Sequence, residues 1–191
     1  MLTKIRKFAI ENSESDGIHG FPHVERVYDL SLKIGKQLDA DIKILKIAAL
    51  LHDIGRNKEI SDTNKRNHAE ISAELAINFL TSTDFNLSKE DIANIVHSIR
   101  AHSFSNEIEP KTLEAKILSD VDKLDALGAI GLYRTIAFTV KSKGGVDQVI
   151  KHLENKIMKL RNQMYLDISK KIAIDRERII LNFYNNIIRE K

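Results

Sequence analysis

The chain has 191 residues, 42% of them hydrophobic and 30% charged, a balance typical of one globular domain and not of a disordered segment. Its 30 basic and 27 acidic residues give a formal net charge of +3, which is too balanced to indicate a partner that is a nucleic-acid polymer. The lack of cysteine excludes disulfides, thiolate zinc sites and cysteine nucleophiles. Because the N-terminal residues have no apolar signal core and no run approaches the ~18 apolar residues of a membrane span, we expect a cytoplasmic protein without a membrane partner.

Apolar residues recur at three- and four-residue spacing along the chain, which predicts an all-α protein. Four helices are expected in the first half: one behind Pro22, one over 42–51, one over 69–80, and one beginning at Ser88 with a capping-box sequence. The segment 42–51 is apolar on most faces, so we expect it at the centre of the fold.

The second half is also predicted to be helical. A fifth helix is expected to begin at Pro110 and to continue, with a bend, to about residue 140, before a Ser-Lys-Gly-Gly break at 142–145. A helix near 146–162 and a long amphipathic one follow, so the C-terminal helices occupy about 145–190. The main loops are predicted at 12–21, 55–66 and 102–109. We expect one domain over 1–191.

A polar pair, His52-Asp53, follows the apolar segment that ends at Leu51. Two polar side chains at the end of a buried helix need hydrogen-bond partners or a metal ion. Adjacent helical residues point about 100° apart, so both can reach one ion only at a helix end, and Gly55 is a suitable terminator. Taken alone, the pair is better explained by capping, with Asp53 on a loop amide and His52 on a backbone carbonyl.

Two further residues change this interpretation. His23 lies near the start of the helix behind Pro22, and Asp122 lies in a helical stretch whose apolar face is interrupted by carboxylates. Carboxylates on an apolar face need a cation. The order His, then His-Asp, then Asp on separate helices resembles the HD-domain superfamily of metal-dependent phosphohydrolases.

The resemblance extends from about residue 17 to 135. The runs that carry it are 19–27, 50–55, 68–73, 101–104 and 120–131. They are similar to the small stand-alone HD hydrolases, some of which are nucleoside triphosphate pyrophosphatases. The resemblance implies an HD-domain helical bundle with a C-terminal helical extension. The sequence departs from the pattern at Gly20, where many relatives have Asp.

Carried over residue by residue, the resemblance implies metal ligation by His23, His52, Asp53 and Asp122, with catalytic roles for the two aspartates. Two imidazoles and two carboxylates suit an ion of intermediate hardness, Mn²⁺ first, with Mg²⁺, Co²⁺, Ni²⁺ and Fe²⁺ as alternatives. Four protein ligands on an octahedral ion leave two positions, for water and for a phosphate oxygen.

The other histidines and nearby cations are assigned more broadly. His68, His102 and His97 are candidates for a second metal site bridged by Asp53, or for contacts to phosphate; for His97 an ordinary helix-surface position is favoured. Candidates for binding substrate phosphate are Arg26, Lys123 and Arg56. Position 56 is where many HD nucleotidases have a catalytic Glu, so another acid would have to act: Glu25, Glu59, Glu70 or Asp125.

The expected function is metal-dependent hydrolysis of a small-molecule nucleotide or phosphate ester, with a nucleoside triphosphate giving a monophosphate and pyrophosphate. One alternative keeps the metal site but acts as an HD phosphodiesterase or 5′-nucleotidase. A second alternative is a helical binding module with a vestigial metal site. The long Ile-rich C-terminal helix is expected to pack on the core or on a second subunit, which leaves a homodimer open.

Overall fold

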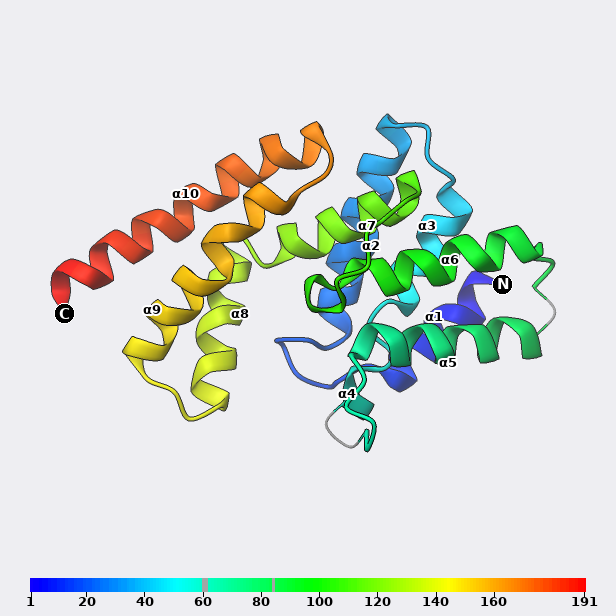
Figure 1. Ribbon diagram of the computed structural model, residues 1–191, viewed down its shortest axis with the longest axis horizontal. Coiled ribbons are helices and arrows are strands. Elements are labelled where there is room, and N and C mark those ends of the chain that lie inside the picture. The colour runs from blue at the N-terminus through cyan, green and yellow to red at the C-terminus, as the bar shows by residue number, and fades with distance from the viewer. Residues whose placement is uncertain (60–61, 84) are drawn as a thin grey trace. The chain divides into compact units, whose positions relative to one another are not determined.

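The computed structural model describes residues 1–59, 62–83 and 85–191. Within these residues the chain consists of α-helices, two 3-10 segments and connecting turns, with no strand (Figure 1), which confirms the all-α prediction. The chain divides into two compact units, Met1–Ser119 and Asp120–Lys191. The expectation of a single domain stays a prediction.

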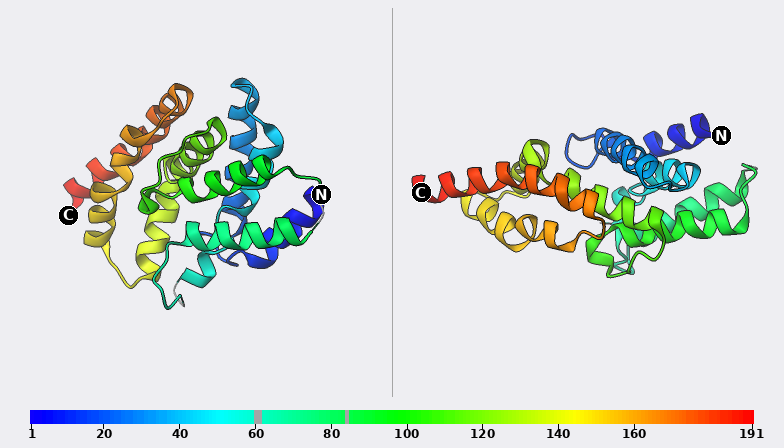
Figure 2. Two further views of the ribbon diagram at one scale, coloured as in Figure 1. Left: turned by 45° about the vertical axis from the view of Figure 1, so that its right-hand side comes forward. Right: turned by 90° about the horizontal axis from the view of Figure 1, so that it is seen from above.

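The helices of the first unit surround α3 (Ile42–Leu51), which packs against α1, α2, α5 and α6. In chain order the described elements are α1 (Leu2–Asn12), α2 (Phe21–Gln37), α3, α4 (Arg56–Glu59), α5 (His68–Ser82), α6 (Lys89–His102) and the 3-10 turn η1 (Phe104–Asn106). Helices α5 and α6 run side by side in each view (Figures 1 and 2).

The central position of α3 follows from its sequence. Ile47, Ala48 and Leu51 are fully buried, as the apolar segment predicted. The carboxylate of Asp41 caps the helix by accepting hydrogen bonds from the backbone N–H groups of Lys43 (2.8 Å) and Ile44 (3.1 Å). The helix ends at Leu51, so its C-terminus delivers the next two residues, His52 and Asp53, into the interior of this unit.

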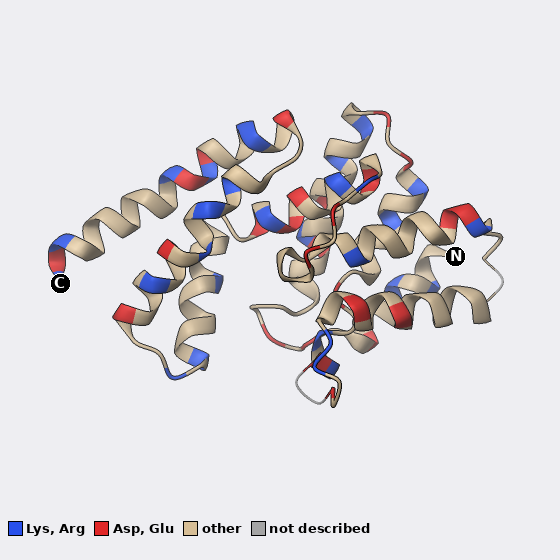
Figure 3. Ribbon diagram, viewed as in Figure 1, with Lys and Arg blue, Asp and Glu red and all other residues tan. Residues whose placement is uncertain are grey.

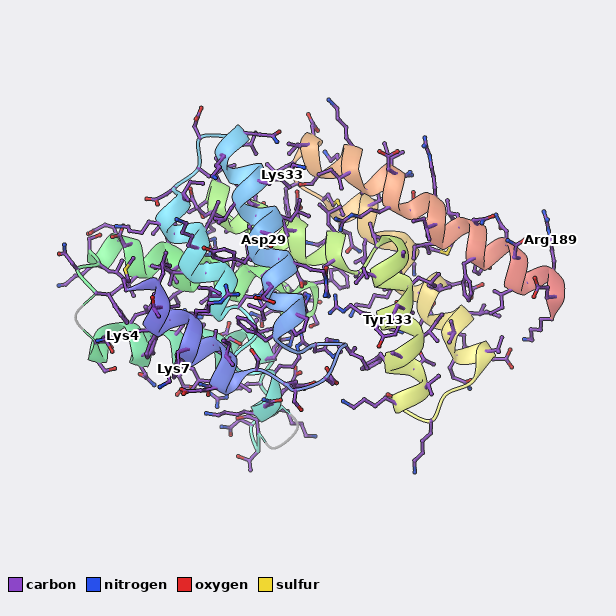
Figure 4. The ribbon with its side chains drawn as sticks, turned by 180° about the vertical axis from the view of Figure 1, so that it is seen from behind. Lys4, Lys7, Asp29, Lys33, Tyr133 and Arg189 are labelled. Carbon is purple, nitrogen blue, oxygen red and sulfur yellow. The ribbon has the colours of Figure 1, made fainter. Side chains whose placement is uncertain are left out.

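Polar residues cover the outward faces of α1 and α2. Lys4 and Lys7 on α1, and Asp29 and Lys33 on α2, are exposed and lie toward the viewer in Figure 4. This alternation of buried and charged positions is the amphipathic pattern of helices that pack on a core with one face. The first unit therefore presents charged side chains on the outward faces of α1 and α2.

Gly55 is the point at which the turn after α3 approaches α5. A Cβ at this position would lie 2.5 Å from the backbone nitrogen of Ser72 and 2.9 Å from the carbonyl oxygen of His68. The N–H of Gly55 donates to Oγ of Ser72 at 2.9 Å. Only glycine allows backbone to approach backbone this closely, and the approach brings the turn carrying Asp53 against the start of α5.

Several predicted boundaries differ from the structure. The fifth helix does not begin at Pro110; α7 (Leu113–Asp125) begins three residues later, because the hydroxyl of Thr112 caps it by accepting from the N–H of Ala115 at 3.2 Å. Helix α1 was not predicted, and α4 and η1 lie in segments expected to be loops. Residues 60–61 of the predicted loop 55–66 lie outside the described residues.

The second unit contains the remaining helices. After the end of α7 these are α8 (Gly128–Lys141), α9 (Val146–Asn155), the 3-10 segment η2 (Ile157–Gln163) and α10 (Asp167–Glu190), which packs on α8, α9 and η2. The predicted break at 142–145 separates α8 from α9. The helix expected near 146–162 is α-helical only to Asn155 and then narrows to 3-10 geometry.

The surface of α10 bears on the oligomeric state. Charged residues are spread over the helices, but the stretch 179–188 of α10 contains none (Figure 3). Ile179 and Ile188 are each 45% exposed. Single exposed apolar residues are common on protein surfaces, so a homodimer through this helix stays a prediction. None of the described helices combines the length and apolar character needed to cross a membrane.

The close approach at Gly55 gives a stability prediction. Gly55→Ala should lower the free energy of unfolding by roughly 1–3 kcal/mol, because the new methyl group meets backbone that cannot rotate away. Urea denaturation followed by circular dichroism measures the change. Gly145→Ala is the control, because a Cβ there meets nothing closer than Oε1 of Gln148 at 3.7 Å. Equal unfolding midpoints for the two variants would contradict the packing argument.

Candidate metal centre

Two histidines stand at the C-terminal ends of central helices in the same local geometry. Nδ1 of His52 donates to the carbonyl of Ala49 at 2.8 Å, and Nδ1 of His102 donates to the carbonyl of Ile99 at 2.6 Å. A ring whose Nδ1 carries the proton has a bare lone pair on Nε2. The carbonyl contact expected of a cap is therefore present at His52, and it also leaves Nε2 available as a ligand.

His23, in the first turn of α2, points its ring at His52. The two Nε2 atoms are 3.2 Å apart, and both side chains are almost fully buried. In the neutral form of His52 with the proton on Nδ1, Nε2 is an acceptor, so a proton of His23 or a cation lies between the two nitrogens. Donors bound at about 2.0–2.1 Å on adjacent corners of an octahedron lie ~3 Å apart, so the observed spacing suits two ligands of one ion.

Asp53 lies at the centre of the cluster, 3% exposed. Its Oδ2 atom is 3.6 Å from Nε2 of His23 and 3.8 Å from Nε2 of His52. Its Oδ1 atom is 3.5 Å from Nε2 of His68 and 3.5 Å from Nε2 of His102. Each carboxylate oxygen therefore faces its own pair of imidazoles, and the two trios share Asp53.

His68, the first residue of α5, is oriented by two charged neighbours. Oε1 of Glu59 is 3.3 Å from its Nδ1 and also accepts from its backbone N–H at 3.0 Å. Nη2 of Arg56 donates to its Nε2 at 3.0 Å. The proton of the ring is thus on Nδ1, and the lone pair of Nε2 is directed at Arg56 and Asp53.

The electrostatics keep the cluster in the protonation states that a metal ion requires. Burial acts to raise the pKa of Asp53, but the positive charge of the Arg56 guanidinium helps to hold that pKa well below its usual range. Burial lowers the pKa of His68 to about 4, with the charge of Asp53 opposing the shift and Arg56 reinforcing it. At neutral pH, Asp53 is ionised and His68 is neutral, as ligands must be.

One atom of the second trio shows that the cluster contains an acceptor without a donor. Nε2 of His102 is buried and has no hydrogen-bond partner among the described residues. Leaving a buried acceptor unsatisfied costs about 1–3 kcal/mol, so Nε2 of His102 is suited to accept from a donor or to bind a cation. The remaining donors, imidazole nitrogens and carboxylate oxygens, are the ligand types preferred by first-row divalent metals.

The other predicted site residues are placed differently. Arg26 lies one turn after His23 on α2 and is half-buried. Nε2 of His97 accepts from the backbone N–H of Lys111 at 2.9 Å, a contact that gives it a structural role. Asp122 and Lys123 lie on α7 within the second unit, so their roles in ligation and phosphate binding stay predictions.

The four acids considered as replacements for the missing Glu at position 56 each have a partner. Glu25 pairs with Arg6, Glu70 with Arg100 and Asp125 with Arg134, whereas Glu59 contacts His68 of the cluster. Glu59 therefore positions a candidate ligand. The sequence did not predict this, nor the pairing of Arg56 with Asp53, although charges three residues apart were a usable signal for the latter.

Comparison with known proteins gives the family of this chain. The sequence model of the HD domain matches residues 20–127. The chain belongs to the HD domain family. Its own HD motif is the pair His52-Asp53 at the centre of the cluster.

Proteins of similar sequence and fold support the assignment of this chain to the HD family. An uncharacterized protein, YpgQ of Bacillus subtilis, is 30% identical over 190 residues, 95% of this chain and 88% of YpgQ. The crystal structure of YpgQ in complex with ADP has a TM-score of 0.79 at 29% identity and covers 100% of this chain and 97% of that one. A predicted HD superfamily hydrolase from an uncultured Thermotogales bacterium has a TM-score of 0.72 at 27% identity, covering 99% and 92%.

A more distant group shares only the HD portion. Ribonuclease Y of Treponema denticola is 35% identical over 112 residues, which are 59% of this chain and 19% of that enzyme. Together, the family match, the fold and the buried His/Asp cluster identify the chain as an HD-superfamily hydrolase with a site compatible with a divalent metal.

The cluster geometry predicts which residues are needed to retain metal. His52→Ala and Asp53→Ala should each weaken binding of Mn²⁺ by more than the roughly 10–100-fold typical of losing an outer hydrogen bond, while helicity stays largely intact. Elemental analysis after desalting, with circular dichroism on the same samples, measures both. His97→Ala is the control, since His97 contacts Lys111 and should retain metal. Stoichiometric retention by both cluster variants would refute the assignment.

Proposed function

We propose that this HD protein hydrolyses nucleoside triphosphates to monophosphates and pyrophosphate, using one divalent ion, Mn²⁺ as first choice, bound by His23, His52, Asp53 and Asp122. The observation that supports it is the convergence of imidazole Nε2 atoms on a buried, ionised carboxylate. The similar protein YpgQ has been crystallised with ADP, which favours a nucleotide over a simple phosphate ester.

The residues of the first unit supply the ligands of the ion and keep water away from them. A divalent ion in such a site activates water and polarises a phosphoryl oxygen. His23 and His52 supply neutral nitrogen donors whose orientation the surrounding helices fix, and Asp53 supplies negative charge in a region that is almost fully buried. Low solvent access strengthens each electrostatic contact with the substrate phosphates.

Cationic side chains near the cluster are proposed to bind the polyphosphate. Arg26 shares a helix face with His23 one turn away, and Lys123 follows Asp122 directly in the sequence. A guanidinium or ammonium forms short, charge-assisted hydrogen bonds with phosphate oxygens. In this proposal Arg26, Lys123 and Arg56 contact the phosphates, and no general acid is assigned.

The similarity to ribonuclease Y favours one alternative, cleavage of a phosphodiester. The shared region is the HD portion alone, about one fifth of that enzyme. The name ribonuclease Y indicates that the relative cleaves RNA, which is a phosphodiester. A single substrate panel separates the two: nucleoside triphosphates, a 5′-monophosphate, a cyclic dinucleotide and a short RNA, each with Mn²⁺, Mg²⁺, Co²⁺ and Ni²⁺. Turnover of the RNA or the cyclic dinucleotide without turnover of triphosphates would replace the proposal with phosphodiester hydrolysis.

The bond that is broken can be identified by hydrolysis in isotope-labelled water. Hydrolysis of a triphosphate in ¹⁸O-labelled water should put the label in the nucleoside monophosphate, because the proposed attack is at the α-phosphorus. Mass spectrometry of the products measures this, and EDTA should abolish turnover completely. Label found only in orthophosphate would contradict attack at the α-phosphorus while leaving a metal-dependent hydrolase.

The phosphate-binding assignment gives a kinetic prediction. Arg26→Ala and Lys123→Ala should each lower kcat/KM by roughly 10–100-fold, the effect of losing a hydrogen bond to a charged group worth about 1.5–3 kcal/mol. Both variants should keep their metal. Lys33→Ala is the control, because Lys33 is an exposed cation on the same helix as Arg26 but two turns further from His23 (Figure 4). Unchanged kinetics in both Arg26→Ala and Lys123→Ala would make these ordinary surface charges.

A further inference from the structure

The two trios of the cluster differ in how many of their ligand atoms contact Arg56. Arg56 contacts two ligand atoms of the trio Asp53, His68 and His102, but only Oδ2 of Asp53 in the trio His23, His52 and Asp53. Asp53, His68 and His102 present ligand atoms close enough to hold an ion of their own. Nη2 of Arg56 lies 3.0 Å from Oδ1 of Asp53 and 3.0 Å from Nε2 of His68. The guanidinium therefore uses the same two lone pairs that an ion bound to this trio would need.

We propose that the guanidinium of Arg56 occupies the place of a second metal ion, so that this HD protein binds a single divalent ion at the His23–His52–Asp53 trio. This inference deepens the proposed function and rests on its metal site. It assigns Arg56 a role in setting the number of ions, in addition to any contact with phosphate.

The contacts of Asp53 explain why one carboxylate accommodates one ion and one guanidinium. Nε of Arg56 also donates to Oδ2 at 2.9 Å, so both carboxylate oxygens accept from Arg56 in a bidentate pair. Each oxygen has a second lone pair. The second lone pair of Oδ2 faces His23 and His52, where the first ion would bind. The second lone pair of Oδ1 faces His102. An ion there would lack His68, because Nε2 of His68 already accepts from Arg56.

The positive charge of Arg56 also disfavours an ion at the second trio. A permanent positive charge within hydrogen-bond distance of two of the three ligands repels a divalent ion at that trio. Arginine cannot release this charge by losing its proton at any ordinary pH. His68 is held in place by Glu59, so it cannot turn its Nε2 away from Arg56 without losing that contact.

His102 is the residue that distinguishes an occupied second trio from an empty one. It is 1% exposed, and its Nε2 atom is the buried acceptor without a hydrogen-bond partner among the described residues. With Arg56 paired to Asp53 and His68, Nε2 of His102 is the ligand atom left over. Removing Arg56 should therefore complete a site whose third ligand is already in position.

Metal counting with Mn²⁺ tests the proposal without any substrate. The wild-type protein and Arg56→Lys, which keeps the positive charge, should bind one ion per chain; Arg56→Gln, which removes it, should bind two. Electron paramagnetic resonance should show isolated Mn²⁺ in the first two proteins and a magnetically coupled pair in Arg56→Gln, since ions that share a carboxylate lie about 3.5–4 Å apart. Adding His102→Ala to Arg56→Gln should return the count to one.

Each outcome bears on the proposal. Two ions in the wild-type protein, or one ion in Arg56→Gln with helicity and the first site intact, would overturn the role of Arg56 and leave the proposed function standing. No bound ion in any of these proteins would overturn both. If Arg56→Gln fails to fold, Arg56→Met measured in the same way decides the question, since it also removes the charge.

Discussion

The first unit is organised by the need to keep one buried carboxylate ionised. Asp53 is 3% exposed, and a charge so far from water is stable only with opposite charge and hydrogen-bond donors around it. The bidentate pair with Arg56 supplies part of this and helps to hold the pKa of Asp53 well below its usual range. A divalent ion on the side facing His23 and His52 would supply the rest.

The fold meets that need through the ends of helices. His52 directly follows α3 and His102 is the last residue of α6; in each, a carbonyl of the last turn accepts from Nδ1 and so fixes which ring nitrogen faces Asp53. Gly55 lets the turn after α3 lie directly on the backbone of α5, which brings His68 to the carboxylate. Local helix-terminal hydrogen bonding and one close backbone contact thus position three of the four imidazoles.

The sequence predicted these features unequally. The apolar run ending in His52-Asp53 was enough to predict a buried central helix and a polar site at its end, because periodicity and burial are local properties. It could not show that Arg56 turns back onto Asp53, or that Glu59 orients His68, since both contacts depend on a tight turn whose path no pattern specifies. The predicted start of the fifth helix at Pro110 was also wrong, because the hydroxyl of Thr112 caps the helix two residues later.

The imidazoles around Asp53 are proposed to bind a divalent ion. A crystal structure of the protein grown with Mn²⁺, with diffraction data collected at the manganese absorption edge, tests it most directly. An anomalous peak is expected at bonding distance from Nε2 of His23, Nε2 of His52 and the carboxylate of Asp53. A peak coordinated only by exposed carboxylates, or a cluster without anomalous signal at saturating Mn²⁺, would contradict it.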